Sequence, residues 1–276
     1  MMFCYLNGQI LKEEEAKVSI FDIGIMRGFG VYEAMTSFGL NILMWHDHFE
    51  RFKKTADFVG IDIPETEDKI KKICLELIYK NGFKRSNIKF ILTGGRAIEG
   101  IFYERNNPTF YILVEEWKTI DQKNYKEGAR VGLAENLRQY PEYKTTDYIT
   151  AVKAYSKTKQ SGYLETLYFK ENLILEFSTS NVFIVKDGVI ITPEKNILKG
   201  ITRKLAINLA EQNGFRVEVR DITLDEVYKA DECFLTSSFK DIVPVVCILE
   251  KQIGEGKVGR VSHKMMSLFN DLVYNL

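Results

Sequence analysis

Helical and strand-like patterns alternate along the whole chain, and this alternation limits the folds that it can adopt. Apolar residues recur at three- and four-residue spacings in four segments, which predicts four helices. These are residues 46–59, 66–81, 202–212 and 261–272. Short runs rich in β-branched and aromatic residues predict strands at 88–93, 109–114, 166–169 and 181–185. Since no repeat of about 20–50 residues is present, solenoids and propellers are excluded and an α+β fold is expected.

The length of 276 residues and a change in composition predict two domains. Residues 1–116 are expected to form a small N-terminal domain and residues 128–276 a larger C-terminal domain. Residues 117–127 lie in a polar stretch and are expected to link the two. In the second domain, Lys186-Asp187-Gly188 separates two apolar runs, which predicts a β-hairpin.

Composition excludes several classes of protein. The chain has 38 basic and 38 acidic side chains, whereas a nucleic-acid-binding protein normally has a basic excess. No apolar run approaches the roughly 18–20 residues that span a bilayer. Residues 1–15 hold a brief apolar patch and then three glutamates, unlike a signal peptide. We expect a soluble, cytoplasmic protein.

Cysteine and histidine offer little chemistry. The four cysteines are widely spaced and should be reduced, and they are Cys4, Cys74, Cys233 and Cys247. His46 and His48 form an H-x-H pair, but no third ligand completes a metal site. We therefore expect no metal, and we expect both histidines to be exposed polar residues at the start of a helix.

Two short glycine and serine motifs can be set aside. Gly28-Phe29-Gly30 resembles half of a phosphate loop, but no Lys-Ser/Thr and no third glycine follow. This motif is expected to form only a turn. A G-x-S-x-G elbow is absent, which excludes the usual serine hydrolase.

Arg51 and Lys144 are candidate functional residues. Arg51 lies between Phe49 and Phe52, so its guanidinium can point inward and bind an anion, or it can be an ordinary helix arginine. Lys144 lies between two tyrosines at the start of a helix. A desolvated lysine can form a Schiff base, and the alternative is a solvated surface lysine.

Three further segments carry polar groups at the ends of apolar runs. Glu176 ends one run and is followed by four small polar residues, so it is either a site carboxylate or an edge residue of a loop. Gly200-Ile201-Thr202 opens a helix whose unpaired N–H groups can bind an anion. Ser237 and Ser238 end a strand with hydroxyl groups. The helix and serine segments can equally be helix caps.

Taken in order, these segments resemble the fold-type IV pyridoxal-phosphate enzymes, the class IV aminotransferases. This family includes branched-chain and D-amino-acid aminotransferases and aminodeoxychorismate lyase. The matching segments span nearly the whole chain, and they are residues 18–22, 28–33, 48–51, the Lys144 segment, 176–183, 186–189, 200–203 and 230–237. The resemblance implies a small N-terminal α/β sandwich domain and a larger, β-barrel-like C-terminal α/β domain that carries the Schiff-base lysine.

The resemblance also implies roles around pyridoxal 5′-phosphate. Lys144 matches the lysine that holds the cofactor and moves a proton between substrate and cofactor. Glu176 matches the carboxylate beside the pyridine nitrogen, which keeps the ring an electron sink. The phosphate cup and remaining cofactor contacts match Arg51, Tyr148, Ser180, Asn181, Ile201, Thr202 and Ser238. The substrate side is expected to include Tyr32, Arg96, Phe239 and Lys240.

The chain departs from the family where substrates are distinguished. Many members carry Thr-Arg-Gly where this chain has Thr93-Gly94-Gly95, and Arg96 is the only cation in the immediate neighbourhood. Family members often continue Ala-Ala-Glu where this chain has Phe239-Lys240-Asp241. The bulky Phe239 can narrow the pocket, and Lys240 can pair with a carboxylate.

The leading hypothesis is therefore an aminotransferase of amino-acid metabolism that moves an amino group from a branched-chain-like amino acid to a 2-oxo acid. Three alternatives stay open: aminodeoxychorismate lyase, a D-amino-acid aminotransferase, and a cofactor-binding relative without activity. The resemblance further implies a homodimer with the active site between domains and a loop contributed by the partner.

Overall fold

The computed structural model describes residues 2–274, which divide into two compact units. The first unit contains residues 2–118 and Tyr143–Tyr148, and the second contains Thr119–Glu142 and residues 149–274. Tyr143–Tyr148, which the sequence assigns to the C-terminal domain, is therefore part of the first unit. Since this segment carries Lys144, each unit is described by itself below.

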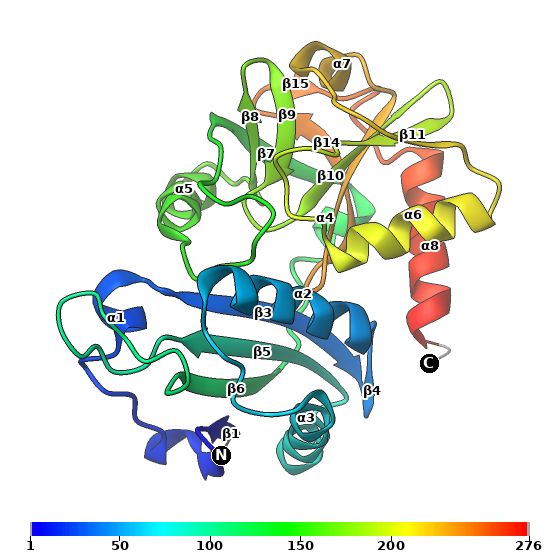
Figure 1. The fold of residues 1–276 in the computed structure, drawn as a ribbon. Coiled ribbons are helices and arrows are strands. Elements are labelled where there is room, and N and C mark those ends of the chain that lie inside the picture. Colours follow the sequence, from blue (N-terminus) through cyan, green and yellow to red (C-terminus); the bar gives the residue numbers. More distant parts are fainter. Residues whose placement is uncertain (1, 275–276) are drawn as a thin grey trace. The chain divides into compact units, whose positions relative to one another are not determined.

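The first unit is built on a six-stranded antiparallel sheet with the order β2-β1-β6-β5-β3-β4 (Figure 1). Its elements are β1 (Phe3–Leu6), β2 (Gln9–Lys12), the 3-10 helix η1 (Glu13–Glu15), α1 (Ile23–Arg27), β3 (Gly30–Phe38), β4 (Asn41–Ile42), α2 (Trp45–Val59), α3 (Glu67–Asn81), β5 (Arg85–Thr93) and β6 (Thr109–Glu116). Thr66 caps α3 at its start, and Gly82 ends it in the left-handed conformation.

Alternation along β3 gives the two faces of this sheet different partners. Val31 and Met35 point to the face that α2 and α3 cover, and they share one core with Phe52 of α2 and Leu77 of α3. Glu33 has the same parity as Val31 and therefore lies under α2. Tyr32 has the opposite parity, so it points to the other face.

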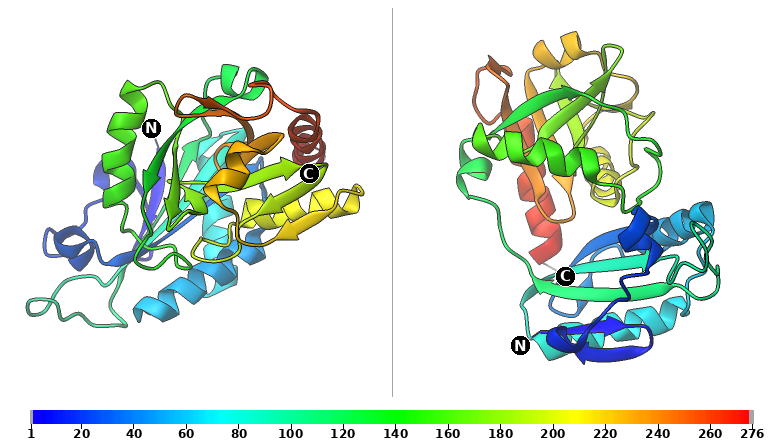
Figure 2. Two further views of the ribbon diagram at one scale, coloured as in Figure 1. Left: turned by 90° about the horizontal axis from the view of Figure 1, so that it is seen from above. Right: turned by 90° about the vertical axis from the view of Figure 1, so that its left-hand side faces the viewer.

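The second unit is built on a curved nine-stranded sheet, a half-barrel in which eight strands follow the order β12-β11-β10-β13-β14-β7-β8-β9 (Figures 1 and 2). Its elements are α4 (Lys123–Lys126), β7 (Ala129–Glu135), α5 (Ile149–Gln160), β8 (Thr166–Lys170), β9 (Leu173–Phe177), β10 (Asn181–Lys186), β11 (Val189–Thr192), α6 (Ile201–Gln212), β12 (Val217–Val219), α7 (Leu224–Tyr228), β13 (Glu232–Ser237), β14 (Asp241–Ile248), β15 (Lys251–Gln252) and α8 (Arg260–Tyr274). Helices α6 and α8 pack together on β13 and β14, whereas α5 packs beside β8.

The α+β fold with its two kinds of sheet confirms the expected fold class. The predicted hairpin is also confirmed: β10 pairs with β11, and the turn residues Asp187 and Gly188 both have positive φ. That backbone matches the right-handed twist of the strands. All four cysteines are buried and free. Among the described residues, no helix combines the length and apolar character needed to cross a membrane.

Candidate functional site

Residues 144–146 lie along the edge of β3 and are held there by main-chain hydrogen bonds. The N–H of Tyr32 donates to the carbonyl of Lys144 at 2.9 Å, and the N–H of Thr146 donates to the carbonyl of Gly30 at 3.0 Å. The N–H of Lys144 in turn donates to Oγ1 of Thr55 on α2 at 3.4 Å. The backbone of Lys144 is therefore fixed on both sides.

The side chain of Lys144 lies between two tyrosines. Its Nζ donates to the hydroxyl of Tyr148 at 3.2 Å and lies 5.1 Å from the ring centre of Tyr32. The two tyrosine rings meet edge to face, with centroids 5.9 Å apart. Burial, helped by the nearby Tyr148, Glu33 and Glu115, raises the pKa of Tyr32 far above its ordinary value, so Tyr32 is neutral. The structure thus groups Lys144 and Tyr148 with Tyr32, rather than with the neighbouring Tyr143 of the sequence motif.

A buried carboxylate organises the side chains under α2. Glu33 is fully buried, and its carboxylate accepts hydrogen bonds from Nε and Nη2 of Arg51 at 2.9 and 2.6 Å. Nδ1 of His48 lies 3.0 Å from the same carboxylate. Arg51 therefore points inward, which is one of the two alternatives that the sequence left open, and its partner here is a carboxylate of the protein. The expectation that His48 is exposed is wrong, because the helical period places it on the same inner face as Phe52 and Thr55.

Burial and the charges in this cluster determine the protonation states of Glu33 and His48. Burial alone would raise the pKa of Glu33, but Arg51 and the hydrogen bond with His48 hold it far below its ordinary value. Burial lowers the pKa of His48, and the charges of Arg51 and Lys144 act in the same direction against the contact with Glu33. A neutral His48 must then carry its proton on Nδ1 to donate to Glu33.

In the second unit, Glu176 is held by a partner that the sequence analysis missed. Its Oε1 accepts a hydrogen bond from Nε of Arg138 at 2.7 Å, and its Oε2 accepts one from the N–H of Leu198 at 3.0 Å. Nδ2 of Asn181 donates to the carbonyl of Leu198 at 2.8 Å. Asn181 thus braces the segment that contacts Glu176.

The segment from Leu198 leads directly into the first turn of α6. Gly200 precedes this helix without a side-chain cap, and Ile201 and Thr202 are buried at its start. A Cβ on Gly200 would lie 2.0 Å from Oδ1 of Asn181, so only glycine allows this approach. Ser238 follows the end of β13, where Thr236 pairs with Asn181. The uncapped N–H groups and these hydroxyl-bearing residues form a set of donors suited to an anion.

Lys240 and Ser180 both contact a second buried carboxylate, Glu165. Nζ of Lys240 lies 2.7 Å from Oε1 of Glu165, and Oγ of Ser180 donates to the same oxygen at 2.5 Å. Lys240, expected on the substrate side, is thus paired with a protein carboxylate. Phe239 beside it is half-buried.

Arg96 and the two preceding glycines lie in the first unit. The guanidinium of Arg96 is exposed and stacks over the ring of Phe21 at 4.7 Å. A Cβ on Gly94 would lie 2.9 Å from Cγ2 of Ile23, and one on Gly95 would lie 2.2 Å from the carbonyl oxygen of Asn107. Close packing therefore leaves no room at Gly94 for a larger side chain such as arginine.

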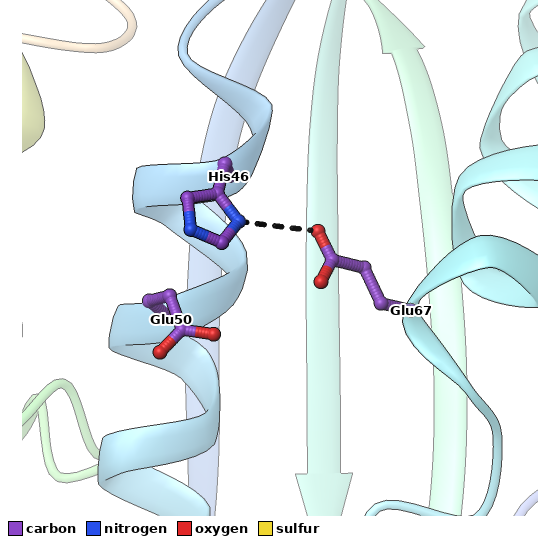
Figure 3. A group of neighbouring side chains, drawn as sticks. All are labelled: His46, Glu50 and Glu67. Atoms are coloured by element: carbon purple, nitrogen blue, oxygen red, sulfur yellow. Dashed lines mark ion pairs between the residues drawn. The ribbon is translucent and has the colours of Figure 1, made fainter.

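The surface trio His46, Glu50 and Glu67 brings its ligand atoms within 4.8 Å of one another (Figure 3). Nδ1 of His46 lies 3.6 Å from Oε1 of Glu67, which also accepts a hydrogen bond from Nε1 of Trp45. The sequence analysis missed this group, since His46 and Glu50 are one helical turn apart but Glu67 comes from α3. Exposed groups of this kind are common without an ion, and we assign the trio no role.

The missed residues Glu33, Arg138 and Glu165 are charged side chains whose partners are distant in sequence. Only Glu33 gave a signal, because the alternation of β3 puts it on the same face as Val31 and Met35. A carboxylate on a buried face requires a cation.

Comparison with known proteins places this geometry in a family. The model of class IV aminotransferases matches residues 30–248. A protein of Methanocaldococcus jannaschii, provisionally named a branched-chain-amino-acid aminotransferase, is 31% identical over 98% of this chain and 96% of its own. The D-alanine aminotransferase of Listeria monocytogenes is 27% identical over 96% and 93%. The solved structure of the branched-chain aminotransferase from Thermoproteus uzoniensis with norvaline aligns with a TM-score of 0.90 at 27% identity, over 99% and 95%.

Replacing Glu33 with Gln should destabilise the first unit by about 3 kcal/mol at pH 7, because Arg51 is left buried without its counter-charge. The pKa of Glu33 is depressed in the folded state, so below its ordinary value of 4.5 only the unfolded chain takes up a proton. Below that value, the difference in free energy of unfolding between the wild type and Glu33→Gln should thus fall by about 1.4 kcal/mol per pH unit. Urea unfolding between pH 7 and pH 3.5 measures this difference.

The matched control is Glu76→Gln, which removes an exposed carboxylate paired with Lys80 on α3. It should change the free energy of unfolding by less than about 0.5 kcal/mol at any of these pH values. Equal effects of the two substitutions would contradict the buried ion pair.

Proposed function

The chain belongs to the class IV aminotransferase family, and on this basis we propose that it binds pyridoxal 5′-phosphate and transfers amino groups from branched-chain amino acids to a 2-oxo acid. The transaminases of this family depend on pyridoxal phosphate. The observation that carries the proposal is the placement of Lys144, with its backbone fixed on β3 and its Nζ beside the hydroxyl of Tyr148.

The residues present fit this cofactor. Lys144 would hold it covalently through Nζ, and Tyr148 would donate a hydrogen bond to its phenolic oxygen. Arg51, the first N–H groups of α6 and the hydroxyls of Thr202 and Ser238 would bind its phosphate, since they offer one cation and several neutral donors. Glu176 would face its ring nitrogen as an ionised carboxylate, which Arg138 at 2.7 Å stabilises in that state.

The cofactor, when bound, supplies an electron sink that makes the Cα–H bond of the amino acid acidic. The protein would supply the base, because Nζ of Lys144 becomes a free amine when the amino group of the substrate takes its place on the cofactor, and it can then move the proton from Cα to a carbon of the cofactor. The ion pair with Glu33 would hold the guanidinium of Arg51 in one orientation, in which it can bind the phosphate. Tyr32, neutral and half-buried beside Lys144, would form an uncharged wall on the substrate side.

One sequence feature supports a branched-chain substrate over a D-amino acid. Residues 96–103 contain one arginine and no histidine, whereas the family resemblance implies a further Arg and a His in this loop of the D-amino-acid enzymes. The lyase activity of the family remains the alternative for the same lysine.

We also propose a homodimer, with a contact surface formed by residues 20–25 and 98–102. These segments run side by side, since the N–H of Ala97 donates to the carbonyl of Phe21 at 2.9 Å (Figure 1). Their apolar side chains are 49–75% exposed, and they are Ile20, Phe21, Ile25, Ile98, Ile101 and Phe102. Apolar side chains gathered in this way typically mark a protein–protein contact, and a second copy of the chain is the partner that the family resemblance implies.

Substitution of Lys144 tests the cofactor. The wild-type protein should be yellow, and borohydride should reduce its Schiff base to a stable covalent adduct. Lys144→Ala should form no adduct and should lose at least about a thousandfold in transaminase rate. Absorbance and intact mass measure the adduct. Lys153→Ala, an exposed lysine of α5, is the control and should behave as wild type. An adduct that persists in Lys144→Ala would refute the assignment.

A substrate panel tests the activity. With 2-oxoglutarate as acceptor, L-leucine, L-isoleucine and L-valine should react faster than D-alanine, and initial rates should show the parallel lines of ping-pong kinetics. Exclusive use of D-alanine would instead assign the chain to the D-amino-acid enzymes. Release of pyruvate from aminodeoxychorismate without any acceptor would assign it to the lyases.

Two charges in the contact surface test the dimer. The double variant Ile101→Asp/Phe102→Asp should elute as a monomer in light-scattering chromatography, because each aspartate would have to be desolvated in the contact. Leu40→Asp, which places the same charge on an exposed residue of the β3–β4 turn, should leave the dimer intact. A monomeric wild type would disprove this part of the proposal.

A further inference from the structure

The carboxylate of Glu165 is buried and fully occupied by protein donors. The residue is only 4% exposed. Oε1 accepts from Oγ of Ser180 at 2.5 Å and contacts Nζ of Lys240 at 2.7 Å. Oε2 accepts from the N–H of Thr179 at 2.9 Å and from Oγ of Ser178 at 3.2 Å. A carboxylate has about four acceptor positions, so these four contacts satisfy it.

The ammonium group of Lys240 is equally committed. Besides Glu165, its Nζ donates to Oγ1 of Thr179 at 2.8 Å and to Oγ of Ser180 at 3.4 Å. An ammonium group has three N–H donors, and three acceptors surround this one. Lys240 is therefore placed to neutralise Glu165 rather than to bind a substrate carboxylate.

The ion pair connects two turns of the second unit. Residues 178–180 follow the end of β9, two residues after Glu176, and lie around Glu165, whereas Lys240 lies two residues after Ser238. The second turn is fixed in its own right, because the N–H of Lys240 donates to Oγ of Ser237 and its carbonyl accepts from the hydroxyl of Tyr125. Moving either turn would therefore separate Lys240 from its acceptors.

We propose that Glu165 and Lys240 are positioning residues that set the distance between Glu176 and Ser238. This inference rests on the proposed function, in which Glu176 faces the ring nitrogen of pyridoxal phosphate and Ser238 contacts its phosphate. A cofactor that is recognised at both ends binds tightly only when those two groups are held at a fixed separation. A buried, fully hydrogen-bonded ion pair provides such rigidity.

The test compares Lys240→Met, which keeps the length of the side chain and removes its charge, with the conservative variant Lys240→Arg. The dissociation constant of pyridoxal phosphate for the apo protein should rise at least about tenfold in Lys240→Met. Lys240→Arg should recover most of this loss, while the KM for 2-oxoglutarate should change by less than about twofold in either variant. Lys186→Met removes a lysine from an exposed pair with Asp231 in the same unit and should leave the dissociation constant unchanged.

A second variant covers the case in which Lys240→Met fails to fold, since it leaves the Glu165 carboxylate buried without a counter-charge. Lys240→Met/Glu165→Gln removes both charges and should fold. Its affinity for pyridoxal phosphate should remain at least about tenfold below that of the wild type, because the ion pair that connects the two turns is lost.

Two results would overturn the inference. An unchanged affinity in the folded apo variants, with only their melting temperature lowered, would make the pair merely structural. An unchanged affinity with a raised KM for oxo acids would make Lys240 a substrate-binding cation. Failure of the wild-type apo protein to bind pyridoxal phosphate at all is a distinct outcome, because it would overturn the proposed function together with this inference.

Discussion

The first unit depends on the pairing of residues 144–146 with the start of β3. Two main-chain hydrogen bonds of 2.9 and 3.0 Å hold the segment there. This approach requires Gly30, because a Cβ at that position would lie 2.8 Å from the carbonyl oxygen of Leu92 and 3.2 Å from Oγ1 of Thr146. Once the backbone is fixed, Lys144 and Tyr148 come to lie beside Tyr32. One close main-chain contact therefore determines where the proposed Schiff-base lysine stands.

Both units solve the problem of buried charge in the same way. Glu33, Glu165 and Glu176 are each less than a tenth exposed, and each lies within 2.6–2.7 Å of one cation. These cations are Arg51, Lys240 and Arg138. Removing a carboxylate from water is costly unless a cation and hydrogen bonds replace the lost hydration. The balance of 38 basic and 38 acidic residues thus includes buried pairs whose geometry is fixed, alongside the exposed charges of the surface.

Local patterns were enough to predict four of the helices, which are α2, α3, α6 and α8, and the hairpin at Asp187-Gly188, but they missed helix α5. They were not enough for contacts between residues far apart in the chain. Glu165 and Lys240 are separated by 75 residues, and neither lies in a motif that suggests the other. Tyr143–Tyr148 has no apolar period of its own, and it joins the first unit through main-chain hydrogen bonds and through single ring contacts such as the stacking of Tyr143 on Phe58. Sequence periodicity indicates which faces of helices and strands are packed, but it does not indicate where an irregular segment such as this one is bound.

The same close packing bears on the choice of substrate. Arginine at position 94, as in many relatives, would displace Ile23 and Tyr103, because even a Cβ would lie 2.9 Å from each of them. Lys240 is committed to Glu165, and the guanidinium of Arg96 stacks on Phe21. The cations that the sequence suggested for a substrate carboxylate are thus absent or already engaged. Both the amino acid and the 2-oxo acid of the proposed reaction carry a carboxylate, so donors other than these cations would have to bind it.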